Sequence, residues 1–288
     1  MLDVCYVVSV NNRNTILDRM AREIWKVAGG EMVYWPCPLP EANLYLAMHY
    51  TIAYSLIEMG LPTVCLFTHE SAEIKPELLN KCKWVICENE YNLLLLKSRG
   101  VSEALLRYIP ECGDNEAFKP HERTPDGAIL VCGTNYANGR KNPELAHKIA
   151  ELLPNRKFIV IGDNWGFGTE NVCTNNVGYQ EYPIMYQKCS VYLSCSKLEG
   201  GGPNSLIEAM HANLIPVVSD TGNARDYIVH GTNGFIFPVD STAEHVASLI
   251  ERAFKFNPKR NFPFHDIWQT VRDFTWTNYA NQVAEYLQ

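Results

Sequence analysis

Three consecutive glycines, Gly200 to Gly202, stand between two glutamates, Glu199 and Glu208. An apolar segment typical of a strand, residues 191–194, precedes the glycines, and Pro203 begins a segment with a helical pattern. Proline is favoured at the first helical position because its missing N–H has no intrahelical partner. The free N–H groups of a first helical turn attract anions, and glycines allow a close approach. This segment therefore predicts a binding site for a pyrophosphate-like anion.

Charged side chains near this segment could serve the same site. Glu208 lies too far into the predicted helix to cap it, and its carboxylate could accept hydrogen bonds from a ribose diol. An isolated helix glutamate is more often an exposed, solvated side chain, and Glu199 faces the same choice. Arg140 and Lys141 would usually be a solvated pair too. They follow a predicted strand and precede Asn142-Pro143, which looks like a helix start, and this place favours a functional role.

The elements that would position these residues alternate along the chain. Short apolar segments between helical patterns are typical of parallel sheets covered on both faces, a doubly wound α/β architecture. Loops that follow the strands then lie at one edge of the sheet, where ligands bind. Strands are predicted at residues 4–10, 63–67, 84–87, 128–132, 157–161, 191–194, 215–218 and 234–237. Predicted helices include residues 15–27, 43–59, 142–153 and 204–212.

The densest cluster of turn and breaker residues, 109–127, predicts a boundary between two Rossmann-like units. We expect a short N-terminal unit of residues 1–117 and a C-terminal unit of residues 118–274. A C-terminal helix at about residues 275–288 is expected to return to the first unit.

A family resemblance extends these expectations. The stretch from Gly178 to Asp240 resembles the C-terminal domain of GT-B glycosyltransferases, in particular the retaining enzymes of family 4, also called glycosyl transferases group 1. The resemblance rests on the two glutamates around the glycine and proline loop, on Glu208-Ala209-Met210, and on the strand and glycine turn at residues 215–223. Upstream, Tyr108-Ile109-Pro110 is similar to the interdomain linker of the family. The resemblance implies a GT-B fold, in which two Rossmann-like domains face each other across a cleft.

The same resemblance implies a role for each residue of the predicted site. The cation pair would bind the donor diphosphate and stabilise the charge of the leaving group, and Glu208 would hold the ribose hydroxyls. Glu199 would contact the donor sugar, although eight residues separate it from Glu208 and the family has seven. His69 would face the transferred sugar from the N-terminal domain, with an ordinary strand-end histidine as the alternative. The predicted catalytic residues are His69, Glu199, Arg140 and Lys141, and the predicted donor-binding residues are Gly200, Gly201, Gly202, Pro203, Asn204, Ser205 and Glu208.

The predicted reaction moves a sugar from a nucleoside diphosphate sugar to an acceptor hydroxyl, with retention of configuration. It needs no metal and no cofactor beyond the donor substrate. The acceptor stays open between a glycan, a lipid-linked acceptor, a protein and a modified nucleic acid. One alternative is a nucleotide-sugar 2-epimerase on the same twin-Rossmann plan, which would need further acid and base residues. The other is a catalytically weakened nucleotide-sugar-binding protein, which the short first unit favours.

Composition limits the partners and the compartment. A formal net charge of −7 gives no strong signal for nucleic acid or membrane binding. Ten cysteines are scattered without a C-x-x-C pair, so reduced thiols without a metal are expected. The histidines form no recognisable ligand set either. Residues 1–10 lack the basic and apolar regions of a signal peptide, and this predicts a cytoplasmic protein.

Overall fold

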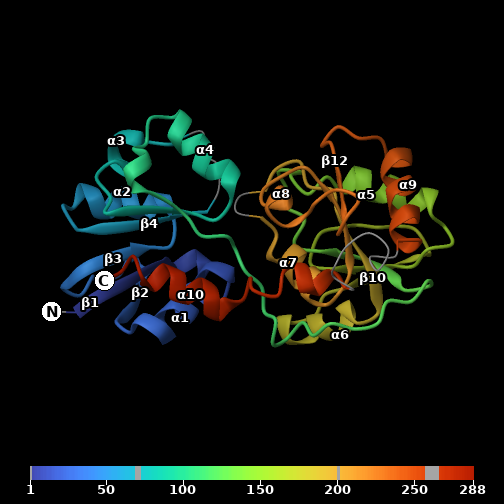
Figure 1. Cartoon of the computed structure of the whole chain (residues 1–288), viewed down its shortest axis with the longest axis horizontal. Helices are drawn as coiled ribbons and strands as arrows, with labels where there is room; N and C mark the ends of the chain where they lie inside the picture. The colour runs from blue at the N-terminus through green and yellow to red at the C-terminus, as the bar shows by residue number, and fades with distance from the viewer. Residues whose placement is uncertain (1, 69–72, 200–201, 257–265) are drawn as a thin grey trace. The chain divides into compact units, whose positions relative to one another are not determined.

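The structure, a computed structural model, describes residues 2–68, 73–199, 202–256 and 266–288 (Figure 1). The chain divides into two compact units, and it passes between them twice. Unit 1 comprises Met1–Cys112 with Phe274–Gln288, and unit 2 comprises Gly113–Asp273. Each unit is built on a six-stranded sheet in which every described strand pair is parallel, so the predicted doubly wound α/β architecture is confirmed.

Unit 1 has the strand order β2-β1-β3-β4-β5-β6. Helices α1 and α10 lie side by side on one face of this sheet, and α2, α3 and α4 belong to the other face (Figure 1). The strands are β1 (Leu2–Ser9), β2 (Glu31–Trp35), β3 (Ala42–Ala47), β4 (Thr63–Phe67), β5 (Trp84–Cys87) and β6 (Leu106–Tyr108). The helices are α1 (Ile16–Ala28), α2 (Tyr50–Glu58), α3 (Pro76–Leu79), α4 (Glu90–Ser98) and α10 (Trp276–Ala284).

The strand β1, which lies between β2 and β3, shows why the apolar segments of this unit are continuous. Cys5 and Val7 enter the hydrophobic core under α2, whereas Val4, Tyr6 and Val8 enter the core under α1 and α10. Successive side chains of a strand point to opposite faces, and both faces of this sheet are covered by helices. An uninterrupted apolar run is therefore the expected pattern for a strand at this position.

Unit 2 has the strand order β12-β11-β10-β7-β8-β9. The chain builds the sheet in one direction from β7 to β9 and then returns to add β10 on the other side of β7, so the order reverses between β7 and β10. Ligands of such sheets bind at the carboxyl ends of the strands that flank this reversal. The strands are β7 (Ala128–Cys132), β8 (Phe158–Ile161), β9 (Val172–Asn175), β10 (Cys189–Ser194), β11 (Ile215–Ser219) and β12 (Phe235–Phe237). The helices are α5 (Pro143–Leu152), α6 (Tyr182–Tyr186), α7 (Asn204–His211), α8 (Ala224–Tyr227) and α9 (Ala243–Phe254).

The helix predicted over residues 43–59 is wrong in its first half. Residues Ala42–Ala47 form β3, which pairs with β1 and β4, and the helix α2 begins only at Tyr50. His49 starts this helix, because its Nδ1 atom accepts a hydrogen bond of 3.2 Å from the backbone N–H of Thr51. A buried strand followed at once by a helix, with no glycine or proline between them, has the same continuous apolar pattern as one longer helix.

None of the described helices combines the length and the apolar character that a membrane-spanning helix needs.

Two strand-end loops of unit 2 approach so closely that a glycine is required. Gly162 follows β8 with φ of +112°, and a Cβ atom placed on it would lie 2.5 Å from the carbonyl oxygen of Gly133, which follows β7. We expect Gly162→Ala to lower the free energy of unfolding by about 2–4 kcal/mol, because it combines a backbone clash with a conformation that favours glycine. Urea unfolding measures this change.

The control for this prediction is Gly166→Ala. Gly166 also has a positive φ, +63°, but no atom lies within 4 Å of the place of its Cβ. The free energy of unfolding of Gly166→Ala should fall only by the cost of placing alanine in the left-handed conformation, about 1–2 kcal/mol. Equal losses for the two variants would show that the loop contact contributes nothing.

Candidate functional site

The charged residues predicted from the sequence come together at the strand reversal of unit 2. Arg140 and Lys141 lie in the loop between β7 and α5, and Glu199 lies in the loop between β10 and α7. A hydrogen bond of 2.7 Å from the backbone N–H of Lys197 to the carbonyl oxygen of Arg140 joins the two loops. Residues far apart in the sequence thus meet where a ligand of this sheet would bind.

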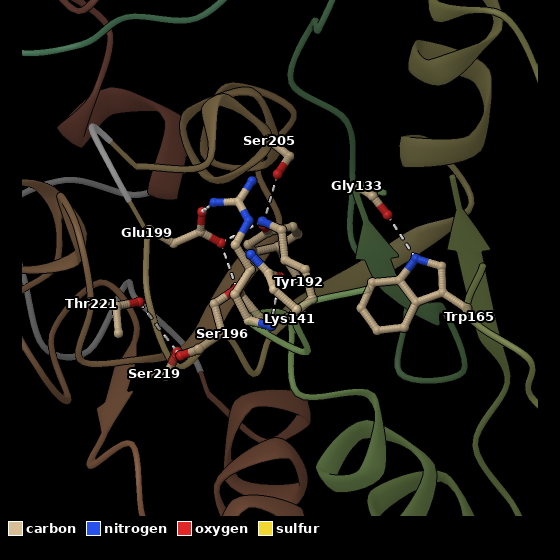
Figure 2. Close-up of polar contacts among 12 residues, drawn as sticks. Gly133, Lys141, Trp165, Tyr192, Ser196, Glu199, Ser205, Ser219 and Thr221 are labelled. Atoms are coloured by element: carbon tan, nitrogen blue, oxygen red, sulfur yellow. Dashed lines mark hydrogen bonds and ion pairs between the residues drawn. The ribbon is translucent and has the colours of Figure 1, made fainter. Parts of the chain in front are cut away.

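Glu199 is the centre of this charged cluster. Its carboxylate is bonded to the ammonium group of Lys141, and the Arg140 Nη1 atom lies 3.4 Å from its Oε2 atom (Figure 2). The hydroxyl of Ser196 also donates to the carboxylate. Glu199 is 6% exposed and Lys141 is 8% exposed. Buried charges are tolerated when they are paired and hydrogen-bonded, and both conditions hold here.

The third member, Arg140, is held from a second direction. Its guanidinium carbon lies 4.3 Å from the ring centroid of Tyr136, a cation–π geometry. The Arg140 side chain keeps 29% of its surface exposed, so it can still reach a bound ligand. Sequence reasoning missed Tyr136, and the only signal was an aromatic residue four positions before the arginine.

Other strand ends fix these loops in place. The Ser219 hydroxyl, at the end of β11, donates to the carbonyl oxygen of Ser196 at 2.6 Å. The indole N–H of Trp165 donates to the carbonyl oxygen of Gly133 at 2.7 Å (Figure 2). Together with the bond between Lys197 and Arg140, these bonds link the loops that follow four neighbouring strands, β11, β10, β7 and β8. The cluster around Glu199 therefore stands on a well-connected scaffold.

Gly202, which lies just before Pro203 and α7, is close to Asn223. Gly202 has φ of +159°, and a Cβ atom on it would lie 2.0 Å from the Asn223 side chain. Pro203 immediately precedes α7, and Asn204 and Ser205 are its first two residues. The Ser205 hydroxyl shares a hydrogen bond of 2.8 Å with the Tyr192 hydroxyl (Figure 2).

Glu208 is buried rather than solvated. It lies on α7, is 3% exposed, and accepts a hydrogen bond from the hydroxyl of Tyr179. Tyr186 is close by: burial raises the pKa of its phenol well above its usual value, and the nearby Cys132 and Glu208 add to this effect. The sequence predicted the acid but not its tyrosine partner, which comes from a different part of unit 2.

Three of the predicted site residues, His69, Gly200 and Gly201, lie outside the residues that the structure describes. The structure thus brings together Arg140, Lys141 and Glu199, and it buries Glu208 on the neighbouring helix. Among residues 2–68, 73–199, 202–256 and 266–288, no group of three or more His, Cys, Asp or Glu side chains is arranged to hold a metal ion.

The fold and this cluster define an α/β protein with a cationic site and a buried acid at the strand reversal of its second sheet. Residues 114–262, more than half of the chain, match the family described as Glycosyl transferases group 1. The chain therefore belongs to this family of glycosyltransferases. The match covers the cation pair, the glycine loop and both glutamates of the site.

Solved structures support the same fold over nearly the whole chain. HepE from Anabaena, in complex with UDP, is 13% identical, has a TM-score of 0.76, and is matched over 98% of both chains. Sucrose-phosphate synthase from Thermosynechococcus elongatus is 15% identical with a TM-score of 0.77, over 98% of this chain and 97% of that chain. The lipopolysaccharide outer core galactosyltransferase WaaB is 13% identical with a TM-score of 0.74, over 98% of both chains. The fold is thus the GT-B fold of these proteins. A search of curated proteins finds no matching sequence.

Proposed function

We propose that the protein is a retaining, metal-independent glycosyltransferase that transfers a sugar from a nucleoside diphosphate sugar to an acceptor hydroxyl. The observation that carries the proposal is the cluster of Arg140, Lys141 and Glu199 at the strand reversal. Retention of configuration is proposed from the resemblance to the family 4 enzymes. The donor is proposed from the chemistry of the cluster and from HepE, whose structure contains UDP.

The cation pair suits the departure of a diphosphate. When the bond between the anomeric carbon and the diphosphate oxygen breaks, negative charge grows on the phosphate oxygens. Two fixed cations can neutralise this charge without reorganisation, and a guanidinium can bind two phosphate oxygens at once. Arg140 and Lys141 would thereby supply the stabilisation that a divalent cation supplies in metal-dependent transferases.

Glu199 pairs with both cations of the cluster. A diphosphate would compete with the Glu199 carboxylate for Lys141 and Arg140, because both anions accept charge-assisted hydrogen bonds from these cations. Displaced from the cations, the Glu199 carboxylate would be available to the hydroxyls of the donor sugar. In this way binding of the donor would replace the ion pairs of Glu199 with ion pairs to the diphosphate.

Glu208 is proposed to bind the ribose of the donor. Its carboxylate lies on α7, whose start follows the glycine loop, so phosphates at the loop would bring the ribose near this helix. An ionised carboxylate accepts hydrogen bonds from both hydroxyls of a vicinal diol.

We also propose a cytoplasmic location. All ten cysteines are free, and eight of them are buried. Burial raises the pKa of the Cys132 thiol to about 12, so this residue stays a protonated, unreactive thiol at neutral pH. A buried set of reduced thiols is typical of proteins that work in a reducing compartment.

A donor panel tests the proposed reaction against its alternatives. The protein is incubated with UDP-, GDP-, ADP- and TDP-sugars, with and without a chelator, and the products are separated by chromatography. Hydrolysis or transfer of the sugar in the presence of the chelator supports the transferase. Interconversion of the donor sugar would instead identify an epimerase, and binding without turnover would identify a binding protein.

The role of Glu208 is tested by nucleotide affinity. We expect Glu208→Ala to weaken binding of the preferred nucleoside diphosphate about 10- to 100-fold, because it removes one or two hydrogen bonds to a charged acceptor. Calorimetric titration measures the affinity. Glu144→Ala is the matched control, since it makes the same charge change at an exposed position of α5. If both variants bind the nucleotide as the wild type does, Glu208 has no part in the donor site.

A further inference from the structure

We infer that Tyr179 is a positioning residue for Glu208, and that its hydroxyl sets how strongly the site prefers a ribonucleotide over a 2′-deoxyribonucleotide. The inference rests on the proposed function, since it assumes that Glu208 binds the ribose of the donor. It adds a residue that neither the motif nor the resemblance identifies.

The geometry places Tyr179 between the interior and the surface. Tyr179 is the first residue of a short 3-10 helix, Tyr179–Glu181, and its hydroxyl donates to the Oε1 atom of Glu208 on α7. Glu208 is 3% exposed, whereas Tyr179 is 39% exposed. The hydroxyl that holds this buried carboxylate thus belongs to a side chain that reaches the surface.

The ring of Tyr179 is held independently of its hydroxyl. It meets the buried Phe118 edge-on, with ring centroids 5.9 Å apart, and it lies 5.4 Å from the ring of Tyr182. The start of its short helix is fixed as well, because the backbone N–H of Gly178 donates to the Glu181 Oε2 atom at 3.2 Å. A phenylalanine at this position would keep these ring contacts and lose the hydroxyl that donates to Glu208.

The chemistry of a carboxylate explains what the hydroxyl does. A carboxylate has two oxygens with about four acceptor positions, so a donor on Oε1 does not by itself exhaust them. That donor also stops the carboxylate from rotating about its last side-chain bond. Pre-oriented groups bind more tightly because less freedom is lost on binding. The effect should be largest for ligands that present both hydroxyls of the ribose, since a 2′-deoxynucleotide offers this carboxylate only its 3′-hydroxyl.

The test compares Tyr179→Phe with the wild type in calorimetric titrations with UDP and 2′-deoxy-UDP, or with the matching GDP or ADP pair if that base binds better. We expect the variant to bind the ribonucleotide about five- to tenfold more weakly and the deoxynucleotide, which keeps only the 3′-hydroxyl, about twofold more weakly. The preference for the ribonucleotide should therefore fall about two- to fivefold. Tyr91→Phe is the control, because it removes a phenol hydroxyl from an exposed position on α4.

The other outcomes separate this inference from the proposed function. If Tyr179→Phe binds both nucleotides more weakly by the same factor, Tyr179 acts only through packing. If the variant binds the ribonucleotide more tightly than the wild type does, the hydroxyl of Tyr179 competes with the ribose for Glu208. Either result overturns the inference, as does a wild-type protein that makes no distinction between the two sugars. Unchanged nucleotide binding in Glu208→Ala would overturn the proposed role of Glu208 in the donor site, and no nucleotide binding at all would overturn the proposed function.

Discussion

Lys141→Met should lower the turnover of sugar transfer by about 10²- to 10³-fold, the usual effect of losing one group that stabilises the charge of the transition state. Methionine keeps the length and apolar stem of the lysine but not its charge. The nucleotide should still bind, because Arg140 and Glu208 remain. Steady-state kinetics with a saturating donor measures the loss in kcat. Lys148→Met, on an exposed face of α5, makes the same charge change and should leave kcat within about twofold of the wild type.

A loss of turnover could also follow from a damaged fold, because Lys141 is bonded to the buried Glu199. Removing one partner of a buried ion pair costs about 3–5 kcal/mol when the remaining charge is unpaired, and less here because Arg140 remains. The double variant Lys141→Met with Glu199→Gln also removes the charge of the carboxylate that has lost its lysine partner. We expect it to recover most of the stability lost by Lys141→Met and none of the turnover. Recovery of turnover together with stability would mean that Lys141 is purely structural.

The parts of the fold that the sequence predicts well are those with continuous apolar runs. The strands at residues 63–67, 84–87 and 128–132 have the predicted bounds, because a strand covered on both faces needs apolar residues at every position. The strand β9, Val172–Asn175, was missed, since it is an edge strand with two exposed residues and no apolar run. The strand β3 falls almost entirely within a predicted helix, because its apolar pattern continues into that of α2 without a glycine or proline between them. Pairing with β1 and β4, which no local pattern reveals, decides its conformation.

In the site, too, local sequence predicts some features and tertiary contacts decide the others. The glycine loop and the two glutamates belong to one short segment, so their types and spacing point to an anion and a diol. The Lys141–Glu199 pair and the Tyr179–Glu208 bond join residues separated by 58 and 29 positions. Only the strand order, which places β10 next to β7, brings the first pair together. Local spacing therefore predicts which groups act on the ligand, whereas their supporting partners depend on tertiary structure.

A second large effect is expected from an acid in unit 1 that has no part in the proposed reaction. Glu88 directly follows β5, is 1% exposed, and accepts a hydrogen bond of 2.9 Å from the hydroxyl of Tyr279 on α10. Burial raises the pKa of its carboxyl from 4.5 to about 7, and the hydrogen bond from Tyr279 opposes this rise. Glu88 thus keeps its proton in the folded protein at pH values where the unfolded chain has released it.

The direction of the pH dependence follows from this difference. Between about pH 4.5 and pH 7 the folded state binds more protons at Glu88 than the unfolded state, so the free energy of unfolding falls as the pH rises. At about 1.4 kcal/mol for each unit of pKa difference, the loss from this residue is about 3 kcal/mol and is complete above pH 7. Below pH 4.5 both states are protonated, and Glu88 contributes no loss.

Glu88→Gln should remove this loss, because the amide stays neutral at every pH and its oxygen can still accept the hydrogen bond from Tyr279. We expect the variant to match the wild type near pH 4.5 and to be more stable by up to about 3 kcal/mol at pH 8. Urea unfolding at a series of pH values measures the difference. Glu90→Gln, an exposed position at the start of α4, controls for the change in net charge and should follow the wild-type curve within about 1 kcal/mol. If the curves of Glu88→Gln and the wild type stay parallel from pH 4.5 to pH 8, Glu88 is ionised in the folded protein, and α10 then contacts a buried negative charge instead of a neutral acid.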